Sequence, residues 1–271
     1  MPGVTAVTRS SSVVVEIGGL PIRLHCDSPT FLRQIEERYA GYVDSSDAAG
    51  FDFEIELAPP DAVSADEDVR VSCDAGRWVM ERGDFRAEWN PATARGRIRQ
   101  TRNPYSLDSV LRIVHTLLLA REGGFLLHAS SAIRNGRAFL FSGVSGAGKT
   151  TMARLAPPDA ALLTDEISYV TRKNGGYFAV GTPFYGELAR PGENLEAPIE
   201  GVYLLAKGPK NKIEPIVGAD AVRGLMANLL FFARDPEFVK LVFDSSFDFV
   251  RRVPVRRLTF VPDTSVWELI V

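Results

Sequence analysis

Gly143-Val144-Ser145-Gly146-Ala147-Gly148-Lys149-Thr150-Thr151 is the stretch that decides how the rest of this chain is interpreted. Its spacing is G-x-x-x-x-G-K-[ST], the pattern of a P-loop. A loop that wraps a polyphosphate turns its backbone N–H groups inward, and glycine takes the required dihedral angles without a Cβ penalty. The pattern predicts that phosphates of a nucleotide are bound by Gly143, Ser145, Gly146, Ala147, Gly148, Lys149, Thr150 and Thr151.

Two side chains of this stretch have predicted chemical roles. The Lys149 ammonium is expected between the outer phosphates, and the Thr150 hydroxyl is expected to hold Mg²⁺. The flanking sequence has the order that the motif requires. Residues 137–142 form a short apolar run typical of a buried strand, and residues 151–156 form a short helical stretch that Pro157 ends. ATP and Mg²⁺ are therefore the expected cofactors.

A pair of carboxylates follows the next apolar run, residues 160–166, which ends in Asp165 and Glu166. In P-loop enzymes a carboxylate at the end of a neighbouring strand organises Mg²⁺, and Asp165 fits this role, with a turn cap as the alternative. On a regular strand Glu166 points the other way, so both acids reach one site only if the strand breaks. The short connection from Thr151 favours a compact kinase acting on a small molecule or a protein.

Composition limits the partners. The chain has 271 residues, 45% of them hydrophobic, which is enough for one or two domains. A net charge of −3 gives no electrostatic case for a nucleic-acid partner. No secretory signal and no apolar run near ~20 residues is found, so we expect a cytoplasmic protein without a membrane partner. The arginine-rich residues 95–102 fit the solvated face of a strand, or a contact for an acidic partner.

The periodicity predicts two domains. Residues 1–104 read as short strands with one helix, a mostly antiparallel β subdomain, and residues 105–271 as an α/β core around the glycine-rich stretch. Residues 219–233 and 236–243 have helical patterns, and residues 182–198 are rich in Pro, Gly and Glu, as an active-site loop would be.

The position of His128 follows from a short turn. Residues 125–133 form a buried strand, and residues 134–137 connect it to the strand before the glycine-rich stretch. This connection is too short for a parallel crossover, which needs about a dozen residues. The two strands therefore form an antiparallel hairpin, which places His128 level with Gly143.

Three segments together resemble the catalytic domain of the HPr serine kinase/phosphorylase family: Leu127-His128-Ala129, the glycine-rich stretch, and Leu163-Thr164-Asp165-Glu166. The resemblance runs from Phe125 to the C-terminus, and the family usually has Asp-Asp where this chain has Asp-Glu. It implies the fold shared with ATP-type phosphoenolpyruvate carboxykinases, α/β with α+β character. It also implies that His128 lies beside the phosphates, with a buried core histidine as the alternative, and that Asp165 organises the metal or acts as the base.

We predict an ATP-dependent kinase that transfers the γ-phosphoryl group to a hydroxyl, a serine on a peptide or protein, with the N-terminal subdomain helping to hold the acceptor. A small hydroxylated metabolite is an alternative acceptor, and a non-catalytic ATP-binding sensor is the rival class. A homo-oligomer is left open. The predicted catalytic residues are Asp165, Glu166, His128 and Lys149, and the predicted metal ligands are Thr150 and Asp165.

Overall fold

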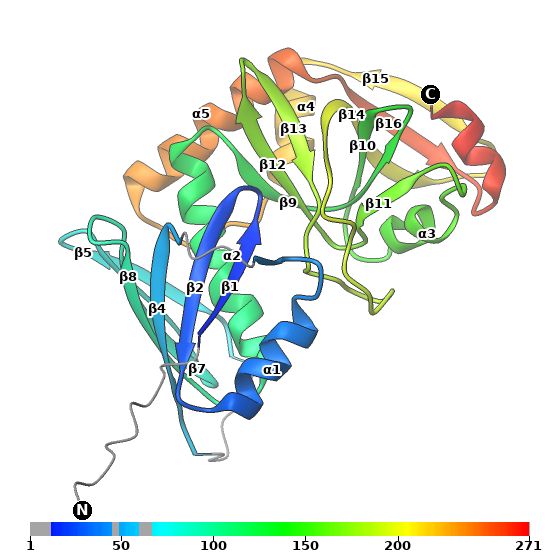
Figure 1. The fold of residues 1–271 in the computed structure, drawn as a ribbon. Coiled ribbons are helices and arrows are strands. Elements are labelled where there is room, and N and C mark those ends of the chain that lie inside the picture. The colour runs from blue at the N-terminus through cyan, green and yellow to red at the C-terminus, as the bar shows by residue number, and fades with distance from the viewer. Residues whose placement is uncertain (1–11, 45–48, 60–66, 271) are drawn as a thin grey trace, which may run out of the picture. The chain divides into compact units, whose positions relative to one another are not determined.

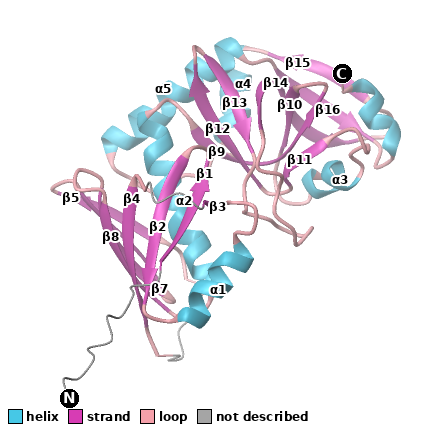
Figure 2. Ribbon diagram, in the orientation of Figure 1, coloured by secondary structure: helices cyan, strands magenta, loops and turns pink. Residues whose placement is uncertain are grey.

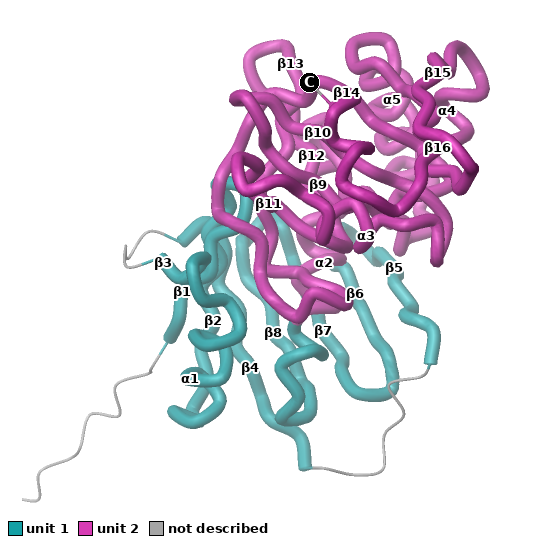
Figure 3. Tube along the Cα trace, turned by 90° about the vertical axis from the view of Figure 1, so that its right-hand side faces the viewer, with its two compact units in different colours: residues 1–107 teal, residues 108–271 magenta. Residues whose placement is uncertain are grey.

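The computed structural model describes residues 12–44, 49–59 and 67–270, and it has a mixed α/β architecture with two large mixed sheets (Figures 1 and 2). The chain divides into two compact units, Met1–Leu107 and Asp108–Val271 (Figure 3). The sequence had placed this boundary between residues 104 and 105. Within the described residues, no helix is long and apolar enough to cross a bilayer.

The first unit is built on an eight-stranded sheet in the order β3-β1-β2-β4-β8-β7-β6-β5. The pairings β2–β4 and β4–β8 are parallel and the others antiparallel, so the mostly antiparallel sheet is confirmed, with a parallel centre that the strand patterns did not indicate. The strands are β1 (Ser12–Ile17), β2 (Leu20–Cys26), β3 (Val43–Asp44), β4 (Phe51–Leu57), β5 (Arg70–Asp74), β6 (Arg77–Arg82), β7 (Phe85–Asn90) and β8 (Arg95–Gln100).

One helix, α1 (Pro29–Arg38), packs its apolar face in this unit. The Ser28 side chain caps its start by accepting the Phe31 N–H at 3.4 Å. The arginine-rich run falls on β8, where Ile98 is buried and the alternate residues face solvent. Arg97 lies 3.5 Å from Glu54 and Arg99 lies 3.5 Å from Glu56. The part of the run on β8 is therefore the solvated face of a strand, and two of its arginines, Arg97 and Arg99, are paired with acids of β4.

The second unit has an eight-stranded sheet in the order β10-β9-β12-β13-β14-β16-β15, with β11 paired to β9. Strand β10 also pairs with β14, so β10, β9, β12, β13 and β14 form a closed circuit. The strands are β9 (Phe125–Arg134), β10 (Arg137–Ser142), β11 (Ala161–Thr164), β12 (Ile167–Lys173), β13 (Gly176–Val180), β14 (Glu196–Lys207), β15 (Lys212–Ile216) and β16 (Val255–Phe260). The helices are α2 (Pro104–Arg121, which begins in the first unit), α3 (Lys149–Arg154), α4 (Gly218–Met226), α5 (Pro236–Arg252) and the 3₁₀ turn η1 (Thr264–Leu269).

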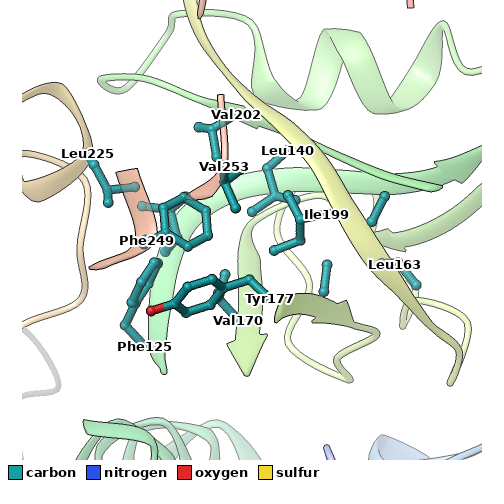
Figure 4. Close-up of a cluster of buried hydrophobic side chains, with 14 of the residues drawn as sticks. Phe125, Leu140, Leu163, Val170, Tyr177, Ile199, Val202, Leu225, Phe249 and Val253 are labelled. Carbon is teal, nitrogen blue, oxygen red and sulfur yellow. The ribbon is translucent and has the colours of Figure 1, made fainter. Parts of the chain in front are cut away.

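Alternation along β10 divides the core of this unit into two clusters. Leu140 belongs to the cluster of Figure 4, in which Phe249 of α5 packs its ring edge-on against Phe125 and Tyr177, with centroid distances of 5.1 and 4.8 Å. Phe141 belongs to the other cluster, with α3 and η1. Both faces of β10 are buried, so the strand that leads into the glycine-rich stretch is held firmly.

Three elements of this unit differ from the sequence prediction. Helix α4 ends at Met226, because residues 228–230 run along β9, with the Leu230 N–H donating to the Leu126 carbonyl at 3.0 Å. Helix α5 continues to Arg252, well beyond the predicted residue 243. Strand β15 was missed, and it contains Pro215, which is tolerated because β15 lies at the edge of the sheet.

Candidate functional site

Residues 143–148, called the glycine loop here, connect β10 to α3. Gly146 and Gly148 have φ angles of +75° and +113°, which L-residues with a Cβ rarely adopt. A Cβ at Gly148 would also lie 2.5 Å from the Phe260 ring. The Lys149 ammonium is folded into this turn, where it donates to the Gly143 carbonyl at 2.9 Å and to the Val144 carbonyl at 3.2 Å. The loop is therefore a tight turn with a cation at its centre.

The β9–β10 hairpin places His128 beside this loop, as predicted. Ser142 is the register partner of Ala129, and the Ser142 hydroxyl donates to the His128 carbonyl at 3.0 Å. Leu127 and Ala129 point into the core cluster, so the His128 side chain lies on the other face of β9. It is partly exposed there and borders a cavity. The sequence alone had not decided this face.

The strand before the two acids does break, and Thr164 makes the break. Its hydroxyl accepts the Glu166 and Ile167 N–H groups, each at 3.1 Å, and donates to the Phe184 carbonyl at 3.1 Å. Strand β11 therefore ends at Thr164, and β12 begins at Ile167. Asp165 and Glu166 lie in the bend between them and both border the same cavity.

Asp165 is buried, with 3% of its surface exposed, and it holds the segment between β13 and β14. Its Oδ1 accepts the Gly186 N–H and its Oδ2 accepts the Leu188 N–H, each at 2.9 Å. The later part of this segment is held by a backbone hydrogen bond, because the Glu193 N–H donates to the Leu162 carbonyl at 2.8 Å. Residues 181–195, the Asp165-held loop, thus cover one side of the cavity, where Gly186 and Glu187 border it.

Glu166 is one-third exposed and forms an ion pair with Arg112 of α2, with Oε2 and Nη2 3.2 Å apart. The Arg112 guanidinium also lies over the Phe184 ring at 5.1 Å. Sequence reasoning missed Arg112. The available signal was a cation within the apolar run of α2, where a solvated position is not expected.

The electrostatics of the site favour a neutral histidine. Burial lowers the pKa of His128 below its usual value, and the positive charges of Lys149 and Arg112 lower it further. Burial also lowers the pKa of Lys149, and the nearby charge of Glu166 opposes this shift. The site therefore combines an uncharged imidazole with a lysine whose positive charge is supported by a carboxylate.

The cavity has a volume of about 330 Å³. Two of the predicted phosphate-binding residues do not border it: the Gly143 carbonyl holds Lys149, and Ala147 is buried. Arg190, in the Asp165-held loop, is exposed and does not border it either. The bordering residues are His128, Ser145, Gly146, Gly148, Lys149, Thr150, Thr151, Asp165, Glu166, Gly186 and Glu187.

The sequence profile described as SynChlorMet cassette protein ScmC matches residues 99–270, more than half of the chain. The chain belongs to the ScmC family. The match includes every residue that borders the cavity and omits most of the first unit.

A search of the curated proteins finds no match to this ScmC-family chain. Among solved structures, the HPr(Ser) kinase/phosphatase from Coxiella burnetii is similar, with 12% identity over 54% of this chain and 85% of that chain. The TM-score is 0.30, and this likeness carries no argument about the site.

The donor set of the ScmC-family cavity fits a Mg²⁺ ion bound together with phosphates. Thr150, Asp165 and Glu166 offer oxygen atoms, the ligands that Mg²⁺ takes. Each carboxylate oxygen of Asp165 keeps a lone pair after accepting one N–H group. Among the described residues, no three His, Cys, Asp or Glu side chains cluster closely enough to hold a metal. Mg²⁺ usually takes only one or two protein carboxylates and completes its shell with water and phosphate oxygens.

Proposed function

We propose that this ScmC-family chain is a Mg²⁺-dependent kinase that transfers the γ-phosphoryl group of ATP to a serine hydroxyl of a peptide or protein. The observation that carries the proposal is the composition of one cavity. Lys149, two carboxylates and a histidine of lowered pKa border it, beside a glycine loop with the P-loop spacing. The choice of acceptor rests on the resemblance of three sequence segments to HPr serine kinases.

The residues of the glycine loop would bind the phosphates. Backbone N–H groups of the loop and the Lys149 ammonium would meet the outer phosphates, once the ammonium leaves the Gly143 and Val144 carbonyls. Thr150 and Asp165 would hold Mg²⁺, which when bound neutralises negative charge on the phosphates. His128, kept neutral by its surroundings, can donate a hydrogen bond to a phosphate oxygen without adding charge.

Glu166 is the better placed of the two acids to act as the base. Both oxygens of Asp165 already accept N–H groups of the Asp165-held loop, whereas Glu166 is one-third exposed and its Oε2 contacts Arg112. In the proposed step the serine oxygen bonds to the γ-phosphorus, the bond from that phosphorus to the bridging oxygen of ADP breaks, and Glu166 accepts the hydroxyl proton. Arg112 orients the carboxylate for this transfer.

The test is a serine-containing peptide library incubated with γ-labelled ATP and Mg²⁺, with phosphoserine located by mass spectrometry. We expect Glu166→Gln to lower transfer by at least about 100-fold, the low end for a positioned base. Glu187→Gln is the matched control, because this glutamate also borders the cavity but has a 73% exposed side chain. Equal loss in both variants, or no loss in either, would remove Glu166 from the mechanism.

A nucleotide sensor is the second candidate, and one observation favours it. The N–H groups of Gly186 and Leu188 donate to Asp165, so this acid links the cavity to the loop. A sensor that moves the loop when nucleotide binds would need such a link. Tight Mg·ATP binding with no transfer to peptides or to small hydroxylated metabolites would support the sensor over the kinase. Transfer to metabolites alone would keep the kinase and replace the acceptor.

A further inference from the structure

Helix α5 carries apolar side chains on two sides. Phe238, Val242 and Phe249 are buried in the second unit. Val239, Phe243 and Phe247 are 41%, 43% and 42% exposed, and their spacing of four residues places them in one row on the helix. The Phe243 and Phe247 rings contact each other, with centroids 4.6 Å apart. We call these three residues the α5 stripe, and a row of this kind on a helix is a sign of a partner.

Exposed charges accompany the α5 stripe along one flank, and they alternate in sign: Glu237, Lys240, Asp244 and Arg251. At 100° per residue, Lys240, Asp244 and Arg251 lie about 60–100° from Phe243 around the helix axis, and Glu237 about 120°, all in the same direction. Lys240 and Asp244 form an i,i+4 ion pair at 2.6 Å within the helix. The flank therefore has the charge order minus, plus, minus, plus.

Both patterns are organised about Phe243. Val239 and Phe247 lie at equal distances from it in sequence, so two antiparallel copies of α5 that cross at Phe243 would place Val239 against Phe247 of the other copy. The same arrangement brings Lys240 to Asp244 of the other copy and Glu237 to its Arg251, each within about 3 Å along the axis. Every flanking charge then meets its opposite. In a parallel, in-register pair the two charged flanks would lie on opposite sides of the contact, so these charges would not pair between the copies.

We propose that a second copy of this chain covers the α5 stripe, forming a two-fold symmetric dimer through antiparallel α5 helices. A second copy fits this surface because the charged flank is complementary to itself: the same four charges supply both members of each ion pair. One helix pair is smaller than the standard interface of about 1,600 Å², so we expect a dissociation constant on the order of 10–100 μM. Such a dimer would form whether or not the chain has kinase activity.

Sedimentation velocity of the full chain tests the dimer. Between about 1 and 200 μM the mass should rise from 29.7 kDa toward twice that value. Phe243→Glu should keep the chain monomeric, and Val217→Glu, at a 77% exposed position on another element, should leave the association unchanged. Lys240→Glu should weaken the dimer at least about tenfold, and adding Asp244→Lys should restore it, because the charge order is again complementary to itself. Thermal unfolding must show that each variant is folded.

Cysteine cross-linking distinguishes antiparallel from parallel pairing. In a Cys73→Ser background, a mixture of Val239→Cys and Phe247→Cys chains should form a disulfide-linked dimer on mild oxidation, and neither chain should do so alone. Linkage within either single variant would show parallel helices and overturn the proposed geometry. A monomer at every concentration, or a dimer unaffected by Phe243→Glu, would overturn the proposal altogether.

Discussion

The backbone N–H of Gly186 donates to Oδ1 of Asp165 at 2.9 Å. This bond joins a residue in the bend after β11 to a loop residue 21 positions later, and the Leu188 N–H makes the matching bond to Oδ2. One carboxylate therefore fixes the loop and borders the cavity at the same time. Loop position and site chemistry are coupled through a single side chain.

Asp165→Asn should loosen the loop as well as impair phosphoryl transfer. The asparagine amide offers one accepting oxygen in place of two, so one charge-assisted bond is lost and the other weakens, a cost of about 1.5–3 kcal/mol. Hydrogen exchange should show faster exchange of the Gly186 and Leu188 amides, and transfer should fall by more than about 100-fold while ATP affinity changes by less than about tenfold. Unchanged exchange would show that Asp165 does not hold the loop.

Lys149→Ala should abolish stabilisation by Mg·ATP. A ligand at 100 times its Kd adds about 2.7 kcal/mol to the stability of the folded state, so the wild-type melting temperature should rise measurably. The variant should show almost no rise, since it lacks the cation that faces the cavity. Lys212→Ala, which removes a 63% exposed lysine of β15, is the control and should behave as wild type. An equal rise in all three proteins would refute phosphate binding by the glycine loop.

His128→Ala should lower turnover by about tenfold or more while moving the melting temperature only slightly. The reason is that the imidazole borders the cavity and is only partly buried, whereas its neighbours Leu127 and Ala129 fill the core. His128→Asn, which keeps a hydrogen-bond donor, should retain more activity than His128→Ala. If the melting temperature falls steeply and turnover per folded molecule is unchanged, His128 is a core residue.

Stability should depend on pH through His115, a buried residue of α2 whose pKa burial lowers to about 3. Its unfolded pKa is about 6.5, so the unfolded chain takes up a proton that the folded protein excludes, and stability is lost as the pH falls from about 6.5 toward 3. Between pH 7 and pH 5, the free energy of unfolding measured with urea should fall by up to about 2 kcal/mol because of this residue. His115→Gln should remove that loss.

The control for this pH dependence is His25→Gln, which changes a 31% exposed histidine of the first unit. The free energy of unfolding of the His25→Gln variant should fall between pH 7 and pH 5 as the wild-type value does. If His115→Gln retains the full wild-type fall, another group is responsible for the acid sensitivity.

Local patterns in the sequence were enough to predict most strands and the β9–β10 hairpin. Alternation and turn residues are local signals, and the turn at Asn135-Gly136 left room for only one topology. The parallel pairings β2–β4 and β4–β8 could not be predicted, because they depend on which distant strand occupies each edge. The predicted end of α4 was wrong for a similar reason, since the pairing of residues 228–230 with β9 outweighs their helical pattern.

For the candidate site, the sequence identified the glycine loop, His128 and both acids, but not how the acids divide their contacts. The hydroxyl of Thr164 creates the bend that brings both acids to the cavity. A threonine at the end of a strand is common, so its presence in the sequence does not predict this bend. Arg112 reaches Glu166 from a helix 54 positions earlier in the chain. Such a contact is set by tertiary packing, which no short stretch of sequence records.

The two pairings of strand β14 affect the order in which the second unit can fold. Its first residues pair with β13 and its later ones pair in parallel with β10, where Ala138 is the partner of Ile199. During synthesis β10 can therefore form its hairpin with β9 early, but its second edge stays open until β14 has left the ribosome. An open strand edge is prone to pair with other chains. A nascent or truncated chain that ends before Glu196 would expose the strand leading into the glycine loop, so aggregation, rather than partial activity, is its expected fate.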